Sequence, residues 1–154
     1  MHAVADLLSA EIEALKRLVA LMSEEQDALK AAQAESLPAL SQTKIELIGE
    51  LNALELQRNA GIGAPLGVDP KKAMQDWLAQ HAADSGLKIR WDEVLNLAQE
   101  AKNLNQINGK LLALHLTRTS EALDVLTIRQ AGSSLYGSNG QTNPLTGSRI
   151  IDSA

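Results

Sequence analysis

The side chains that most often carry chemistry in proteins are few and scattered in this chain. Its 154 residues include three histidines, His2, His81 and His115, and no cysteine. The lack of cysteine excludes disulfides, thiolate metal ligands and cysteine nucleophiles. No histidine stands in an H-E-x-x-H or E-x-x-H pattern, the spacings by which helices bind metal ions. We therefore expect neither a metal ion nor any other cofactor.

The remaining candidates for catalysis are weak. His81 and Asp84 are three residues apart, but Asp84 lies at an expected helix end, which predicts a solvated pair. His115 is expected at the edge of an apolar helix face, without a serine or aspartate placed as its nucleophile. The glycines of Gly61-Ile62-Gly63 lack the preceding strand and the third glycine of a dinucleotide-binding loop. The chain is therefore expected not to be an enzyme.

Composition and charge restrict the partners. The net charge is −5. The two adjacent lysines Lys71 and Lys72 are too few to form a nucleic-acid-binding patch. We therefore expect no nucleic-acid binding. The acidic run Glu24, Glu25 and Asp27 is interpreted as a solvated helix face. The longest uninterrupted apolar run, Leu18 to Met22, is far too short to span a membrane. With no signal peptide recognisable at the acidic N-terminus, the prediction is a cytoplasmic protein without stable membrane insertion.

Hydrophobic spacing predicts an all-α fold. Aromatic residues make up only 2% of the chain, and leucine and alanine dominate the apolar positions. A first helix is expected from about Ala3 to Gln33, because its leucines and methionine recur every seven residues at Leu8, Leu15, Met22 and Leu29. After a short break near Glu35, with Ser36 as N-cap, a second helix should run to about Ala60. The two should form an antiparallel hairpin.

A loop and two further helices should follow. Gly61 to Gly67 reads as a loop, and Asp69-Pro70 as the cap and first residue of a short helix ending near Ala83. The last helix should run from about Leu87 to Ala131 and pack against the hairpin. Together these elements make a three- to four-helix, coiled-coil-like bundle over residues 1–131. Residues 132–154 are rich in Gly, Ser, Thr and Asn, which predicts a flexible tail.

The apolar stripe of the last helix leaves two interpretations open. At about 1.5 Å per residue this helix would be roughly 67 Å long, against roughly 45 Å for the hairpin. The excess would fall near Leu116 to Ile128, where the stripe would be free to bind a partner. Alternatively, the helix is kinked or the stripe is covered by a second copy in a homodimer. In that second interpretation the protein is a structural, self-associating coiled-coil adaptor without cargo.

Two short stretches carry a family resemblance. Leu104 to Leu112 reads LNQINGKLL, and Leu135 to Thr142 reads LYGSNGQT. Together they resemble the FlgN family of flagellar type III export chaperones. The family pattern L-N-x-x-N-G-x-L-L is met at Leu104, Asn105, Asn108 and Gly109, and L-Y-G-x-x-G-Q is met in the tail. Lys110 stands where a buried position would require an apolar residue. The two asparagines are expected to fix the helix register or to hydrogen-bond across the bundle, and the sequence leaves open whether they contact a cargo.

The resemblance implies both partners and site residues. It implies a chaperone that binds the C-terminal helix of the hook-associated proteins FlgK and FlgL, prevents their premature assembly and delivers them to the export gate protein FlhA. Cargo would be held by the C-terminal helical region, which maps here onto Leu111, Leu112, Leu116, Leu123 and Leu126. The Leu-Tyr-Gly motif would bind the export gate, and in this chain it is Leu135, Tyr136 and Gly137.

Overall fold

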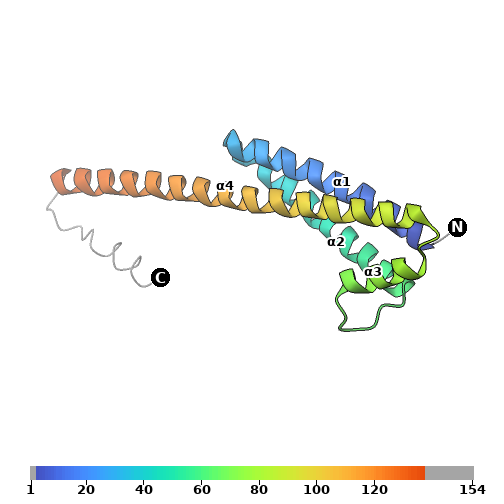
Figure 1. The fold of residues 1–154 in the computed structure, drawn as a ribbon. Coiled ribbons are helices and arrows are strands. Elements are labelled where there is room, and N and C mark those ends of the chain that lie inside the picture. The colour runs from blue at the N-terminus through green and yellow to red at the C-terminus, as the bar shows by residue number, and fades with distance from the viewer. Residues whose placement is uncertain (1–2, 138–154) are drawn as a thin grey trace. The chain divides into compact units, whose positions relative to one another are not determined.

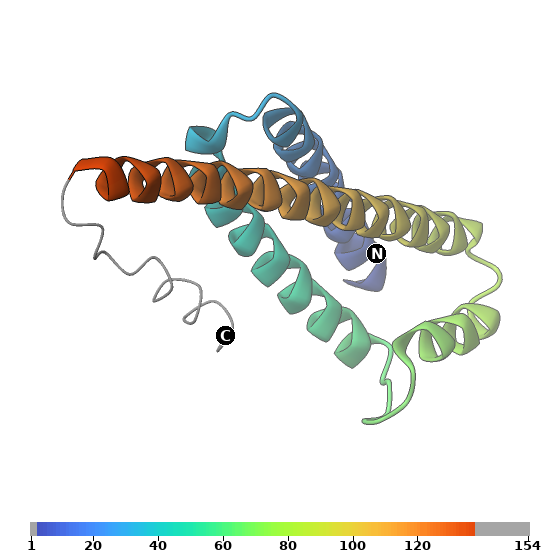
Figure 2. The same cartoon turned by 90° about the vertical axis from the view of Figure 1, so that its left-hand side faces the viewer.

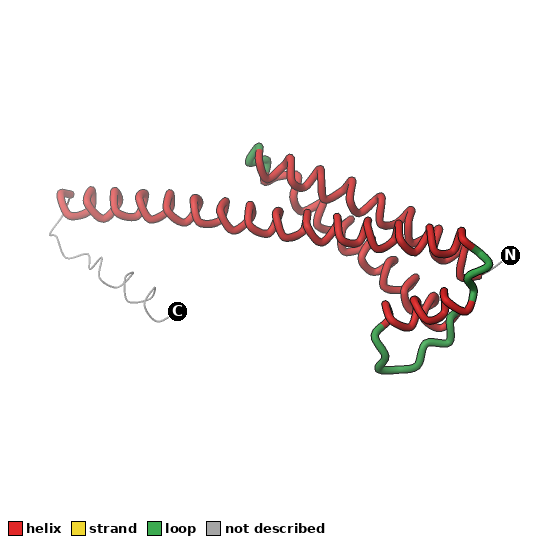
Figure 3. Tube along the Cα trace, viewed as in Figure 1, coloured by secondary structure: helices red, strands yellow, loops and turns green. Residues whose placement is uncertain are grey.

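The protein is described by a computed structural model that covers residues 3–137, with side chains described as far as Ile128. Within this range it contains four α-helices, one short 3-10 turn and no strand, which confirms the predicted all-α class (Figures 1 and 3). The helices are α1 (Ala3–Lys30), α2 (Leu37–Gly61), α3 (Pro70–Gln80) and α4 (Ser85–Gly137), and the 3-10 turn is Ala34–Ser36.

The chain divides into two units, Met1–Leu112 and Ala113–Ala154, and α4 runs through both. In the first unit, α1 and α2 run in opposite directions from the turn that joins them, as Figure 2 shows. The helical hairpin predicted from the sequence is therefore present. Of the second unit the structure describes helix α4 as far as Gly137.

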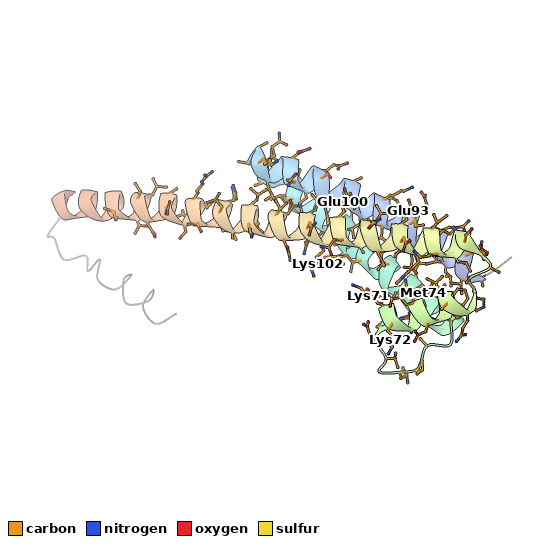
Figure 4. The ribbon with its side chains drawn as sticks, viewed as in Figure 1. Lys71, Lys72, Met74, Glu93, Glu100 and Lys102 are labelled. Carbon is orange, nitrogen blue, oxygen red and sulfur yellow. The ribbon has the colours of Figure 1, made fainter. Side chains whose placement is uncertain are left out.

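The seven-residue seam of α1 forms the centre of the bundle. Its four predicted residues, Leu8, Leu15, Met22 and Leu29, are all buried. The first core cluster joins α1 to α3 and to the beginning of α4 through Val4, Leu8, Ile12, Leu15, Met74, Leu87, Trp91 and Val94. Met74, labelled in Figure 4, is completely buried. A second cluster, composed of Leu18, Met22, Leu47 and Ala101, joins α1, α2 and α4 farther along the bundle.

Local capping explains three of the helix ends. Asp69 accepts a hydrogen bond from the backbone N–H of Lys71 at 3.1 Å, and Pro70 is the first residue of α3, as predicted. Asp84 caps the start of α4 in the same way, accepting from the N–H of Gly86 at 3.1 Å. At the end of α1, Ala32 has a φ of 54°, and the N–H of Gln33 donates to the carbonyl of Ala28 at 2.9 Å. This hydrogen bond and the positive φ define a Schellman turn, in which Ala32 takes the left-handed position that glycine usually occupies.

Several predicted boundaries were wrong by a few residues. Helix α1 ends at Lys30 rather than Gln33 because of the Schellman turn. Ser36 precedes α2, but its hydroxyl donates to the carbonyl of Gln33 and does not cap the helix. Helix α3 ends at Gln80 rather than near Ala83. Helix α4 extends to Gly137 rather than Ala131, because adding residues to an existing helix needs no new nucleation. The rest of the predicted tail, 138–154, lies outside the described residues.

A buried ion pair crosses the first core cluster. Arg58 of α2 donates to the carboxylate of Glu11 of α1, and both side chains are almost fully buried. The guanidinium also lies 4.8 Å from the ring centre of Trp91 on α4, a cation–π contact. Burial raises the pKa of the Glu11 carboxyl, and Arg58 only partly offsets this effect. Such a pair helps to specify how α1 and α2 pack, because separating its partners would leave an unpaired charge in the core.

We predict that the single and double replacements of this pair differ sharply in stability. Arg58→Met leaves the Glu11 carboxylate buried and unpaired, which should lower the free energy of unfolding by about 3 kcal/mol at neutral pH. Glu11→Leu combined with Arg58→Met should return the stability to within about 1 kcal/mol of the original chain. Urea unfolding followed by circular dichroism measures all three.

The pH dependence supplies the control. A raised carboxyl pKa means that the folded state holds the proton more tightly than the unfolded state. The stability deficit of Arg58→Met should therefore shrink as the pH is lowered toward the raised Glu11 pKa, while the double variant should show no such change. A double variant as unstable as the single one would show that the pair itself stabilises the fold.

Candidate functional site

The motif residue Asn108 lies on α4 where the helix packs against α1. Its side chain is only 3% exposed. The amide nitrogen donates to the backbone carbonyl of Met22 at 2.8 Å and to the carboxylate of Glu25 at 2.8 Å. Asn108 therefore hydrogen-bonds across the bundle, as one of the expected roles requires.

The second motif asparagine belongs to the same polar network. The ammonium group of Lys44 on α2 donates to Glu25 at 3.1 Å and to the side-chain oxygen of Asn105 at 2.9 Å. Glu25, Lys44, Asn105 and Asn108 thus connect α1, α2 and α4, and we refer to these four residues as the motif network. The interpretation of Glu25 as part of a solvated acidic face was wrong, because its carboxylate is largely buried and bonded to two partners.

The other motif residues have clear positions. Leu104 is half-buried against the second core cluster. Lys110 is exposed, so its charge does not conflict with the motif. Gly109 is exposed, and a Cβ atom built on it would meet no heavy atom within 4 Å.

Burial along α4 changes at Asn108. Before it, Leu87, Trp91, Val94 and Ala101 are buried, whereas after it no described side chain as far as Ile128 is buried. Leu111 is half-buried, and the other residues expected to bind cargo are exposed, namely Leu112, Leu116, Leu123 and Leu126. The intervals of four, seven and three residues between these four leucines put them on one side of a helix. We refer to Leu112, Leu116, Leu123 and Leu126 as the leucine face.

A shallow groove lies beside the motif in the first unit. It has a volume of about 460 Å³ and is lined by residues from α1, the turn after it, α2 and α4. Its apolar lining comes from Leu29, Leu37, Pro38 and Leu112, and Asn108 and Gly109 also line it. We refer to it as the motif groove. Leu112 is shared between this groove and the leucine face.

The predicted gate-docking residues are only partly described. Leu135, Tyr136 and Gly137 fall in the last residues of α4. Their side chains lie outside the described part of the chain, as does the rest of the LYGSNGQT stretch beyond Gly137.

Ionisable groups do not gather into a reactive cluster in the described residues. His81 stacks on Trp77 with ring centres 3.9 Å apart, and its Nδ1 lies 2.8 Å from the Trp77 carbonyl oxygen. Asp84 caps the start of α4. Lys71 and Lys72 are exposed on the first turn of α3 (Figure 4). Over residues 3–137 we find no group of three potential metal ligands, and no helix with the length and apolar character that a membrane span requires.

Comparison with known proteins finds a matching family model and several relatives. Residues 1–144 match the family model described as FlgN protein. The chain is 29% identical over 145 residues to the flagella synthesis protein FlgN of Salmonella typhimurium, an alignment covering 93% of this chain and 92% of the relative. The protein of the same name from Escherichia coli matches with the same identity and coverage. That from Proteus mirabilis is 27% identical over 143 residues, or 92% and 90% of the two chains. No solved structure matches the chain.

We predict that Asn108→Asp destabilises the bundle although it hardly changes the size of the side chain. An aspartate cannot donate to the Met22 carbonyl, and its charge would face the Glu25 carboxylate. The free energy of unfolding should fall by about 2 to 3 kcal/mol. Asn103→Asp is the matched control. Asn103 is exposed on the same helix and accepts a hydrogen bond from Gln99, which an aspartate can still accept. Equal losses in the two variants, measured by chemical unfolding, would show that the motif network does not hold α4 in place.

Proposed function

This chain belongs to the FlgN family, and we propose from that membership that it is a flagellar export chaperone rather than a general assembly factor. The names of its relatives assign it a role in the synthesis of flagella. The proposed cargo is the C-terminal helix of the hook-associated proteins FlgK and FlgL. Covering that helix would prevent premature assembly, and delivery would end at the export gate protein FlhA. The proposed location is the cytoplasm.

The leucine face is the observation that carries this proposal. Leu116 and Leu123 are 59% and 58% exposed, and Leu112 and Leu126 are also largely accessible. Regularly spaced leucines on one side of a helix are the kind of surface that an amphipathic helix covers when it binds. Isolated exposed leucines are common on protein surfaces, but a row of four is an apolar patch.

The proposed mechanism is reversible binding, without a chemical step in this chain. A cargo terminus that becomes ordered only on binding loses conformational entropy, and this loss limits its affinity. Limited affinity suits a cargo that must later be handed over. Gate docking through Tyr136 would then be separate from cargo binding, because it uses residues outside the leucine face.

We predict that polar replacements on the leucine face strongly weaken cargo binding without unfolding the helix. Leu116→Gln with Leu123→Gln should weaken binding of the C-terminal helical segment of FlgK or FlgL about a hundredfold, since each leucine would lose the burial it gains in the complex. Isothermal titration calorimetry measures the affinity, and circular dichroism checks the helix content.

The opposite side of α4 provides a matched control. Leu114 and Val125 are exposed to a similar degree but lie on the other side of the helix by their spacing. Leu114→Gln with Val125→Gln should therefore leave the affinity nearly unchanged. Failure of the original chain to bind either segment, together with a concentration-dependent dimer in analytical ultracentrifugation, would favour the self-associating adaptor instead.

We predict that Tyr136→Ala weakens binding to the cytosolic part of FlhA but leaves cargo affinity within about twofold of the original. The physical reason is that an aromatic side chain is a common anchor of small interfaces. Ile151→Ala, outside the Leu-Tyr-Gly motif, is the control and should affect neither interaction. Loss of cargo binding in Tyr136→Ala would instead place Tyr136 in the cargo site.

A further inference from the structure

Gly109 lies in the interior of α4, where glycine is the least favourable residue after proline. A glycine in a helix is usually required either by a positive φ or by a neighbouring atom that leaves no room for a Cβ atom, and neither reason applies here. The described glycines with positive φ are Gly63 and Gly67 in the loop after α2, so the backbone at Gly109 does not require glycine. A Cβ atom at this position would also meet nothing within 4 Å in the described chain. Nothing described within this molecule therefore explains why residue 109 lacks a side chain.

The surroundings of Gly109 indicate what could explain it. Gly109 lines the motif groove, next to the apolar side chains of Leu29, Leu37 and Leu112. The charged groups in the groove are already paired, because Lys44 contacts the Glu25 carboxylate at 3.1 Å. A partner lying in the groove would therefore meet an apolar surface that offers no unpaired charge.

The helical surroundings also restrict the form of the occupant. The groove is built from helices and the turn between α1 and α2, and helical backbone groups are bonded within their own helix. An extended peptide would find few partners there for its own N–H and C=O groups, which is costly on an apolar surface. A helical segment satisfies these groups internally, and a glycine allows its backbone to approach closely.

We propose that the motif groove receives one turn of the cargo's amphipathic helix, with the cargo backbone passing directly over Gly109. This inference rests on the proposed chaperone function and makes it more specific. Leu112 lines the groove beside Gly109, so the bound turn would also contact this leucine. The cargo site then includes the corner between α1 and α2, and a small cargo residue faces Gly109.

The test compares two glycines that differ only in their position. Gly49 is an interior glycine of α2, its Cβ position is also open, and it does not line the motif groove. Both Gly109→Ala and Gly49→Ala should raise Tm, by about 2 to 4 °C, because alanine favours helix. Only Gly109→Ala should weaken binding of the C-terminal helical segment of FlgK, by at least about tenfold in calorimetry on the full chain, because the added methyl group prevents close approach.

Each other outcome has a definite meaning. Unchanged affinity in a stabilised Gly109→Ala variant would overturn the groove proposal and leave cargo capture by the leucine face intact. An equal loss of affinity in Gly49→Ala would also overturn it, because the effect would then come from helix stability rather than from the groove. Failure of the original chain to bind the segment would overturn both the proposed function and this inference.

Discussion

The hydrogen bonds of Asn108 are the constraint on which the rest of the structure depends. An amide buried on the apolar side of α4 is costly unless it is bonded, and here it bonds to the Met22 carbonyl and to Glu25. Sliding α4 by one residue would break both contacts. The same residue marks the end of the buried part of α4, since the side chains that follow, as far as Ile128, are half-buried or exposed. One asparagine thus fixes the helix and separates its packed part from its accessible part.

A core made almost entirely of aliphatic side chains needs such polar contacts. Leucine, valine and alanine pack in many alternative registers at similar free energy, and the chain contains no phenylalanine and only two tryptophans to distinguish them. Two polar contacts lie in different core clusters, and each involves α1, α2 and α4. One is the Glu11–Arg58 pair beneath Trp91, and the other is the motif network. Buried polar groups of this kind add little net stability but penalise alternative registers strongly.

Features set by neighbouring residues, such as helix faces and caps, could be predicted from the sequence, whereas side-chain pairings between helices could not. The seam of α1 and the Asp69-Pro70 cap follow from neighbouring residues, and both were predicted correctly. The pairing of Arg58 with Glu11 could not be predicted, because 47 residues separate them and both resemble ordinary surface charges. Asparagines within an apolar stripe did signal bonding across the bundle, but not to Glu25 and Lys44. Nor does periodicity distinguish Val94 from Leu116, since both continue the same stripe and only one is buried.

The accessible leucines make sense only if the protein tolerates an apolar surface that a stable monomer would normally cover. Replacing Gly109 with alanine would make the helix more stable, and replacing the leucine face with polar residues would make the chain more soluble. Natural chains often retain such unfavourable features where they bind partners, because stability above the needed threshold is not selected. Gly109 and Leu112 both line the motif groove. A role in binding a partner explains why each of these two unfavourable features is retained.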